Sequence, residues 1–218
     1  MGSHEEGGGS ASEQLKARSR AAFDEQAESY DGGMQGSHAR SLYPRVVAVA
    51  REALSGQRAP RILDVGCGTG ALACRLLDAV PACRLTGIDL SSAMVARARG
   101  CLAGRADVLE GDAERLPFHD ESFDLVVCND SFHHYPDPKR AAFQMWRVLR
   151  RGGMLVVGDV WQPAPARAIM NAWMPLSHEG DVRMYSESEL RELLGTWFKR
   201  VGWERVGFTA CVATAHKE

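Results

Sequence analysis

The chain has 218 residues, of which 45% are hydrophobic and 25% charged, and its formal net charge is −2 at pH 7. This length is typical of one domain with a substantial core. The charge provides no basic surface for nucleic acid, and the apolar stretches are shorter than the roughly 18 residues that a membrane-spanning helix needs. We therefore expect no nucleic-acid partner and no membrane insertion, and either a monomer or a homodimer, between which the sequence does not distinguish.

Residues 1–10 are rich in Gly, Ser and Glu and lack the apolar stretch of a signal peptide, so a flexible tail is expected there. A single domain is expected over 11–218. Its first part, 11–55, contains helical patterns near 11–22 and 38–54. We interpret this part as a helical cover over the rest of the domain.

The stretch 62–70 joins a buried-strand pattern to a glycine-rich turn. Gly66 and Gly68 lack a Cβ atom, so the backbone can turn sharply there and approach a ligand closely. A helix expected near 70–80 points its N-terminal N–H groups at the turn. The pattern predicts a loop that binds a nucleotide cofactor. It also satisfies the looser G-x-G-x-x-G/A pattern of dinucleotide-binding proteins.

Two further acidic residues follow predicted strands. Asp89 ends a strand expected over 84–89, about 20 residues after the glycine turn, the spacing at which a carboxylate binds ribose hydroxyls. NAD and S-adenosylmethionine both offer such a ribose, and Asp89 can alternatively cap the next helix. Asp112 follows a strand expected over 106–110, where a carboxylate can accept a hydrogen bond from the adenine amine.

Strands and helices alternate over the rest of the chain, which is typical of an α/β protein with a parallel sheet. The Ser186-x-x-Glu189 capping box marks the start of the last helix. Further helices are expected over 91–102, 138–150 and 187–197, and strands over 61–65, 84–89, 106–110, 123–128, 153–159, 201–208 and 210–217.

Four additional motifs complete the pattern: Phe23-Asp24-x-x-Ala27-x-x-Tyr30-Asp31, Leu116-Pro117-Phe118, Phe123-Asp124-Leu125-Val126-Val127 and Leu149-Arg150-Arg151-Gly152-Gly153. Together with the glycine turn and the two acidic sites, they resemble the class I S-adenosylmethionine-dependent methyltransferases. The resemblance covers residues 20–217 and is strongest to the small-molecule branch that includes ubiquinone and menaquinone biosynthesis enzymes.

The resemblance implies S-adenosylmethionine as cofactor and S-adenosylhomocysteine as product. It also implies a Rossmann-like doubly wound sheet with helices on both faces, mostly parallel with one antiparallel strand near the C-terminus. In this family Asp64 and the glycine turn hold the methionine end of the cofactor, Asp89 the ribose, and Asp112 the adenine. The implied cofactor-binding residues are Tyr30, Asp64, Gly66, Cys67, Gly68, Asp89, Leu90, Asp112, Ala113 and Asn129.

The loop after the fourth predicted strand is expected to line the reaction site, because ligands bind beyond the carboxyl ends of parallel strands. Methyltransferases that act on the amino nitrogen of adenine or glutamine resemble one another here by an Asn/Asp-Pro-Pro-aromatic motif. This chain has Asp130 and Ser131 in place of the prolines. Methylation of nucleic acid or of protein amides is therefore disfavoured.

His133 and His134 in this loop are the candidate catalytic residues. An imidazole with an ordinary pKa of ~6.5 can accept a proton from a hydroxyl or a carbon acid at neutral pH. Alternatively, one of the two packs or holds the loop. Methyl transfer needs little chemistry from the protein, because alignment of the reactants can supply up to roughly 7–11 kcal/mol.

A substrate-side loop is expected over 160–185, where Trp and Met residues can form an apolar pocket or a dimer contact. His178, Glu179 and Asp181 match no strong ligand spacing, so we expect a solvated loop and no metal. The six cysteines show no C-x-x-C spacing, which predicts reduced, buried thiols in a cytoplasmic protein.

We expect a methyltransferase that acts on oxygen, carbon or nitrogen of a small, partly apolar acceptor. The alternatives are an NAD(P)-dependent oxidoreductase and a non-catalytic cofactor-binding module. Asp64 beside the glycine turn, Gly111-Asp112 and the final strand pair disfavour the oxidoreductase.

Overall fold

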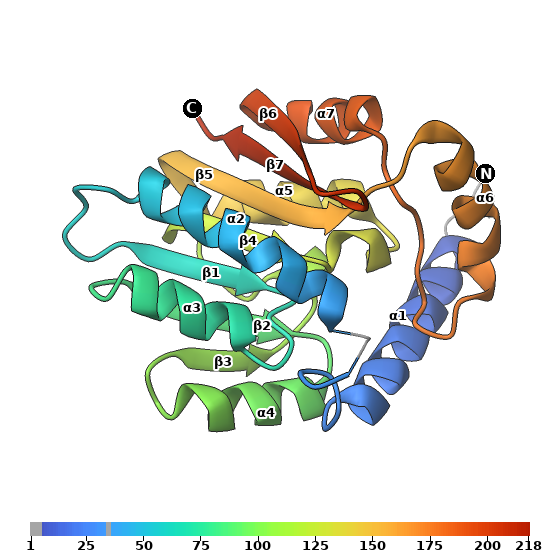
Figure 1. The fold of residues 1–218 in the computed structure, drawn as a ribbon, viewed down its shortest axis with the longest axis horizontal. Helices are drawn as coiled ribbons and strands as arrows, with labels where there is room; N and C mark the ends of the chain where they lie inside the picture. The colour runs from blue at the N-terminus through green and yellow to red at the C-terminus, as the bar shows by residue number, and fades with distance from the viewer. Residues whose placement is uncertain (1–5, 34–35) are drawn as a thin grey trace.

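A computed structural model describes residues 6–33 and 36–218, and its centre is a seven-stranded sheet (Figure 1). The strand order is β3-β2-β1-β4-β5-β7-β6, and β7 is antiparallel to both of its neighbours while the other neighbouring pairs are parallel. This confirms the predicted α/β fold with one antiparallel strand. The strands are β1 (Arg61–Val65), β2 (Arg84–Asp89), β3 (Asp107–Glu110), β4 (Phe123–Asn129), β5 (Leu149–Val160), β6 (Lys199–Val206) and β7 (Ala210–His216).

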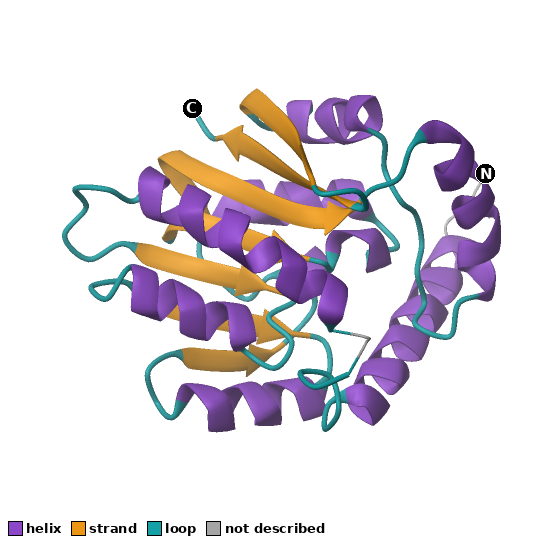
Figure 2. Cartoon of the chain, in the orientation of Figure 1, coloured by secondary structure: helices purple, strands orange, loops and turns teal. Residues whose placement is uncertain are grey.

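Helices cover both faces of the sheet (Figure 2). Successive residues of a strand point to opposite faces, so Ile62 and Leu63 of β1 belong to two different clusters of buried side chains. Burial of each such side chain contributes roughly 1.5–3 kcal/mol. The first cluster includes α2 (Ser37–Ala53), α3 (Ala71–Ala79) and α4 (Ser92–Leu102), and the second includes α5 (Pro138–Val148) and α7 (Glu187–Gly195).

Two helices lie beyond the carboxyl ends of the parallel strands: α1 (Glu6–Gln26) and α6 (Ala164–Trp173) (Figure 1). Residues 1–5 of the expected tail lie outside the described residues, but the rest of that segment is part of α1. Its run of glycines has low helix propensity, which explains why the sequence pattern indicated a later start.

The substrate-side loop expected over 160–185 also differs from the structure, because it contains α6 and the 3₁₀ turn η3 (Met174–Leu176). Pro163 precedes the helix and Pro165 lies in its first turn, where a proline costs no helical hydrogen bond. No residue of α6 is fully buried, and Trp173 is exposed. A helix that packs so little gives a weak sequence signal.

The six cysteines are unpaired. Cys67 and Cys128 are buried as expected, but Cys101 is exposed on the surface of α4. The expectation that all six thiols are buried was therefore wrong. In the part of the chain that the structure describes, no helix has the length and apolar character needed to cross a membrane.

Candidate functional site

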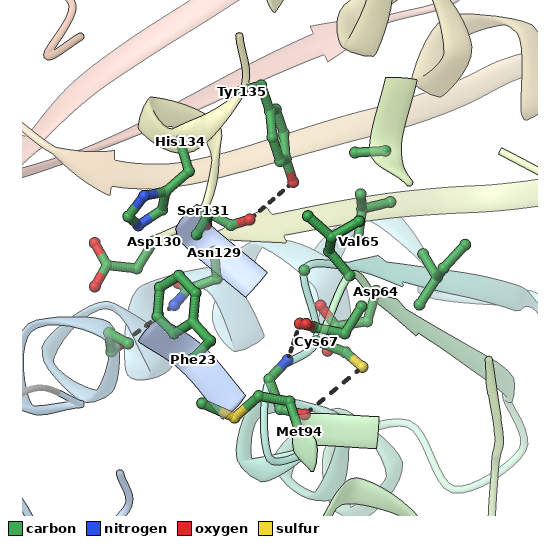
Figure 3. Close-up of a pocket in the computed structure, with 18 of the residues that line it drawn as sticks. Phe23, Asp64, Val65, Cys67, Met94, Asn129, Asp130, Ser131, His134 and Tyr135 are labelled. Carbon is green, nitrogen blue, oxygen red and sulfur yellow. Dashed lines mark hydrogen bonds between the residues drawn. The ribbon is translucent and has the colours of Figure 1, made fainter. Parts of the chain in front are cut away.

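A pocket lies at the carboxyl ends of β1, β2, β3 and β4, where the strand order reverses between β1 and β4 (Figure 3). This switch point is where open α/β sheets bind ligands. All ten residues predicted to bind the cofactor line this one pocket. The chain brings them together from the segment after α1, the glycine turn, and the ends of β1, β2, β3 and β4.

The glycine turn connects β1 to α3 and passes against the loop after β4. Gly66 has a φ of +70°, and a Cβ atom there would lie 2.1 Å from Ser131 Oγ. The backbone N–H of Gly68 donates to Asp89 Oδ2 at 2.8 Å, which ties the turn to the end of β2. Thr69 Oγ1 donates to Asp31 Oδ1 at 2.6 Å, so the segment after α1 also holds the turn.

Asp89 has a fixed orientation, because its two carboxylate oxygens accept the backbone N–H groups of Gly68 and Ser91 at 2.8 and 2.9 Å. The helix after β2 is capped by Ser91, whose Oγ accepts the N–H of Met94 at 3.0 Å. Asp89 is therefore not the N-cap. Each of its oxygens retains a further acceptor site, which suits two ribose hydroxyls.

Asp64 is buried, and its Oδ2 has no hydrogen-bond partner among the described residues. Burial and the nearby charge of Asp89 raise the pKa of Asp64 to about 7. A buried carboxylate without a partner is unfavourable. The site thus fits a ligand that brings a cationic ammonium group, as the methionine end of S-adenosylmethionine does.

Asp112 has a partner that sequence analysis missed. Lys16 of α1 places its Nζ 2.8 Å from Asp112 Oδ2 and 2.5 Å from Glu114 Oε2, in the 3₁₀ turn η1 (Ala113–Arg115). Burial opposes the charge on Lys16, but these two carboxylates raise its pKa. No local pattern identifies Lys16, because its role depends on how α1 packs over the pocket.

The other predicted cofactor residues have less specific surroundings. Tyr30 lines the pocket, and its ring meets Phe23 edge-on at 6.2 Å between centroids. Asn129 Nδ2 donates to the Ala39 carbonyl at 3.3 Å, while its Oδ1 is buried without a partner among the described residues. The backbone of Leu90 reaches α1, because its carbonyl accepts a hydrogen bond from an arginine there.

A second pocket adjoins the first and shares Phe23, Tyr30, Asp130 and His134 with it. Its other side is formed by His133 and by residues of the 160–185 segment, including three methionines. An apolar wall faces a group of carboxylates and imidazoles. This arrangement suits a small, partly apolar ligand next to a bound cofactor.

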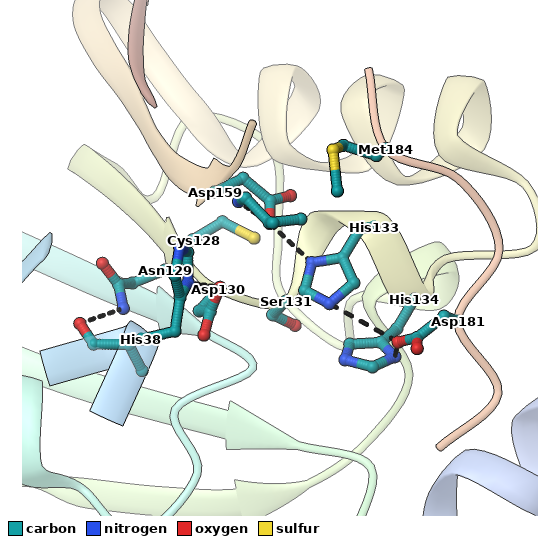
Figure 4. Close-up of polar contacts among 12 residues, drawn as sticks. His38, Cys128, Asn129, Asp130, Ser131, His133, His134, Asp159, Asp181 and Met184 are labelled. Atoms are coloured by element: carbon teal, nitrogen blue, oxygen red, sulfur yellow. Dashed lines mark hydrogen bonds and ion pairs between the residues drawn. The ribbon is translucent and has the colours of Figure 1, made fainter. Parts of the chain in front are cut away.

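The two predicted catalytic histidines belong to a compact ionisable cluster (Figure 4). His133 Nδ1 lies 2.5 Å from Asp159 Oδ1, and its Nε2 lies 3.6 Å from Asp181 Oδ1. His134 Nδ1 is 3.1 Å from the same Asp181 oxygen, though not in hydrogen-bond geometry. We had expected Asp181 to lie in a solvated loop, but it is part of this cluster. Asp159 was missed, although it stands near the carboxyl end of β5, where site residues gather.

The pKa values of His133 and His134 are shifted in opposite directions by their surroundings. Burial opposes protonation of His133, but the charge and hydrogen bond of Asp159, with the charges of Asp130 and Asp181, raise its pKa to about 9. Burial and the charge of His133 lower the pKa of His134 well below its ordinary value. At neutral pH, His133 is thus a cation held by Asp159, and His134 is a neutral imidazole at the junction of the two pockets.

The reversed β7 strand and the acidic residues at or just beyond the ends of β1, β2 and β3 are features of Rossmann-like methyltransferase folds, which places the protein in that class. Residues 63–157 match the family model described as a methyltransferase domain. This part of the chain is a methyltransferase domain of the class I S-adenosylmethionine-dependent kind.

Among its relatives, demethylmenaquinone methyltransferase of Chlorobaculum tepidum is 39% identical over 161 residues, which are 70% of this chain and 64% of the relative. The 27-O-demethylrifamycin SV methyltransferase of Amycolatopsis mediterranei is 42% identical, over 49% of this chain and 41% of the relative. The alignments thus span less than two thirds of these curated relatives. Among solved structures, the [4+2]-cyclase SpnF matches with a TM-score of 0.68 and 25% identity, covering 79% of this chain and 80% of that one.

Family membership implies S-adenosylmethionine as the cofactor. It confirms the predicted family and disfavours the oxidoreductase alternative. The unpartnered oxygen of Asp64 and the oriented carboxylate of Asp89 fit this cofactor.

Proposed function

We propose that the protein transfers the methyl group of S-adenosylmethionine to a small, partly apolar acceptor in the second pocket. The observation that carries this proposal is the wall that the two pockets share. Phe23, Tyr30 and His134 line both, so an acceptor in one pocket meets a cofactor in the other at a single place. The names of the relatives, which refer to menaquinone, rifamycin and malonyl-acyl carrier protein, support small acceptors.

In this proposal each cofactor-binding residue has a defined partner. Asp64 pairs with the ammonium group, Asp89 accepts both ribose hydroxyls, and Asp112 with the Ala113 backbone binds the adenine. Bound S-adenosylmethionine supplies an electrophilic methyl group. The chain orients the acceptor and excludes water, since α1 and α6 lie beyond the strand ends.

The two histidines take different roles when the acceptor is a hydroxyl or a carbon acid. His134 is neutral and lines both pockets, so it accepts the acceptor's proton. His133 is cationic and paired with Asp159, so it stabilises negative charge that develops on the acceptor. Acceptors that need no base react through alignment alone.

Cofactor specificity is tested by the melting temperature with S-adenosylmethionine, S-adenosylhomocysteine, NAD or NADP. A ligand at 100 times its Kd adds about 2.7 kcal/mol to the free energy of unfolding. S-adenosylmethionine and S-adenosylhomocysteine should therefore raise the melting temperature, and NAD and NADP should not. Asp89→Ala removes most of this shift, whereas the exposed Asp107→Ala keeps it. A shift with NAD alone contradicts the proposal.

Catalysis needs a separate test, because the similarity to a cyclase shows that this fold also occurs with another named activity. Formation of S-adenosylhomocysteine is measured with demethylmenaquinone, demethylrifamycin and simple phenols as acceptors. Methylated product in equal amount to S-adenosylhomocysteine supports methyl transfer. Tight cofactor binding with no turnover on any acceptor supports the non-catalytic module instead.

A further inference from the structure

The helices α3 and α4 carry two cysteines whose sulfur atoms are in contact. Cys74 Sγ lies 3.2 Å from Cys101 Sγ. We propose that these two thiols form an oxidation site, at which a disulfide oxidant such as glutathione disulfide creates an intramolecular Cys74–Cys101 bond. A disulfide has an S–S distance of about 2.05 Å, so the sulfurs must approach by only about 1 Å.

Oxidants can reach this pair. Cys101 is exposed and Cys74 is half-buried. Cys67, Cys128 and Cys211 are buried, and the half-buried Cys83 has no thiol within hydrogen-bond distance in the part of the chain that the structure describes. The pair thus combines access with a second thiol in reach, which distinguishes it from the other four cysteines.

The surroundings assign an order to the two thiols. Burial and the hydrogen bond with Cys101 raise the pKa of Cys74 to about 11. Cys101 is exposed whereas Cys74 is half-buried, so Cys101 is the thiol that an oxidant reaches first. Arg105, whose charge acts on Cys74, stands beside the pair and is held by Asp78 at 3.0 Å.

The chemistry is thiol–disulfide exchange and balances without another reactant. The Cys101 thiolate attacks one sulfur of glutathione disulfide and releases one glutathione thiolate, which leaves a mixed disulfide on Cys101. Cys74, after losing its proton to solvent, attacks the Cys101 sulfur and releases the second glutathione. Two protein thiols are oxidised, and one glutathione disulfide is reduced to two glutathione molecules.

The bond would enclose the segment that carries β2 and Asp89. Cys74 lies in the first turn of α3, where its N–H donates to the Gly70 carbonyl at 2.9 Å, and Cys101 lies in the last turn of α4. Gly70 also packs against α4, since a Cβ there would lie 3.2 Å from Ala98 Cβ. Oxidation therefore fixes the packing of two helices at the glycine turn. By restricting the unfolded chain, it stabilises the fold.

The test treats the reduced full-length chain with glutathione disulfide, followed by mass spectrometry and peptide mapping under non-reducing conditions. Wild type and Cys83→Ser should lose two hydrogens and yield a Cys74–Cys101 cross-linked peptide. Cys74→Ser should stop at a glutathione adduct on Cys101. Cys101→Ser should form no intramolecular bond.

The melting temperature supplies a second measurement. Oxidised wild type and Cys83→Ser should melt several degrees above their reduced forms, and reduction should reverse the shift. Cys74→Ser should show no such rise. A stable glutathione adduct on wild type, a cross-link between chains, or a bond that needs Cys83 would each overturn the proposal. No step requires methyl transfer, so the outcome is independent of the proposed function.

Discussion

At the scale of single residues, Asp64 shows how the site is prepared for a charged ligand. Its carboxyl group is buried, has a pKa of about 7 and lacks a partner for Oδ2 among the described residues. In the proposed complex, the ammonium group of the ligand supplies the missing partner. Because this group favours the ionised carboxylate, binding below pH 7 should release a proton.

The raised pKa of Asp64 predicts how stability depends on pH. The native state holds the Asp64 proton up to about pH 7, whereas the unfolded chain loses it near 3.8. Stability should therefore fall as pH rises from about 4 to 7, by on the order of 4 kcal/mol for this residue alone. Asp64→Asn should remove that contribution in urea unfolding measured at several pH values. An identical pH dependence in wild type and variant contradicts the assignment.

The proposed proton acceptor gives the second prediction. His134→Gln should lower single-turnover methyl transfer to a hydroxyl acceptor ~10²–10⁴-fold, because a glutamine cannot accept the proton. Affinity for S-adenosylhomocysteine should stay within a few fold. The exposed His119→Gln serves as the control and should change neither quantity. A normal chemical step in His134→Gln leaves alignment alone to account for the rate.

Single residues also show how far the sequence could predict the site. Asp64 and Asp89 line the pocket, and both could be named from the sequence, Asp64 through the family resemblance and Asp89 through its place at the end of a strand. Lys16 and Asp181 were not, because each reaches the site from a segment distant in sequence, Lys16 to Asp112 and Asp181 to the histidines. Such contacts depend on tertiary packing, for which a single sequence carries no periodic signal.

At the scale of whole elements, α1 connects the two pockets to the rest of the domain. Lys16 binds the carboxylates of Asp112 and Glu114 beside the first pocket, and Gln26 Nε2 donates to Glu179 Oε1 at 2.9 Å beside the second. Asp24 accepts hydrogen bonds from Ser91 Oγ and the Ala93 N–H at 2.6 and 3.1 Å. The second half of the helix is thus held by polar contacts.

These contacts predict that Lys16 controls the opening of α1. Lys16→Met should increase hydrogen exchange in α1 several-fold, because Asp112 and Glu114 lose their shared cation while the apolar stem is kept. The exposed Glu25→Ala, in the same helix, should leave exchange unchanged. The core strands should exchange equally in all three proteins. Unchanged protection of α1 in Lys16→Met contradicts a fastening role for the ion pair.

The elements also differ in how well the sequence predicts them. β1 and β2 have the predicted bounds, because their apolar runs lie between clear turn signals. The start of α7 was marked by a capping box that the structure contains. In contrast, α6 was missed and α1 was predicted too short. Prolines lie at the start of α6 and glycines at the start of α1, and neither helix packs on a face of the sheet.

At the scale of the whole molecule, one sheet joins two clusters of apolar side chains. Alternate residues of β1 and β4 contribute to opposite faces, so neither face can lose its strands while the other stays intact. This shared sheet predicts a single cooperative unfolding transition. A destabilising substitution on one face should therefore shift the unfolding transition measured by a probe on the other face.

Tryptophan fluorescence makes this prediction testable, because Trp146 of α5 packs on the face opposite α3, and its ring contacts that of Trp197, which follows α7. Leu76→Ala, a fully buried position of α3, should cost about 2–5 kcal/mol and shift the fluorescence transition as far as the circular dichroism transition. The exposed Leu176→Ala should shift neither. If Leu76→Ala moves the circular dichroism signal alone, the two faces unfold separately and the single cooperative transition is ruled out.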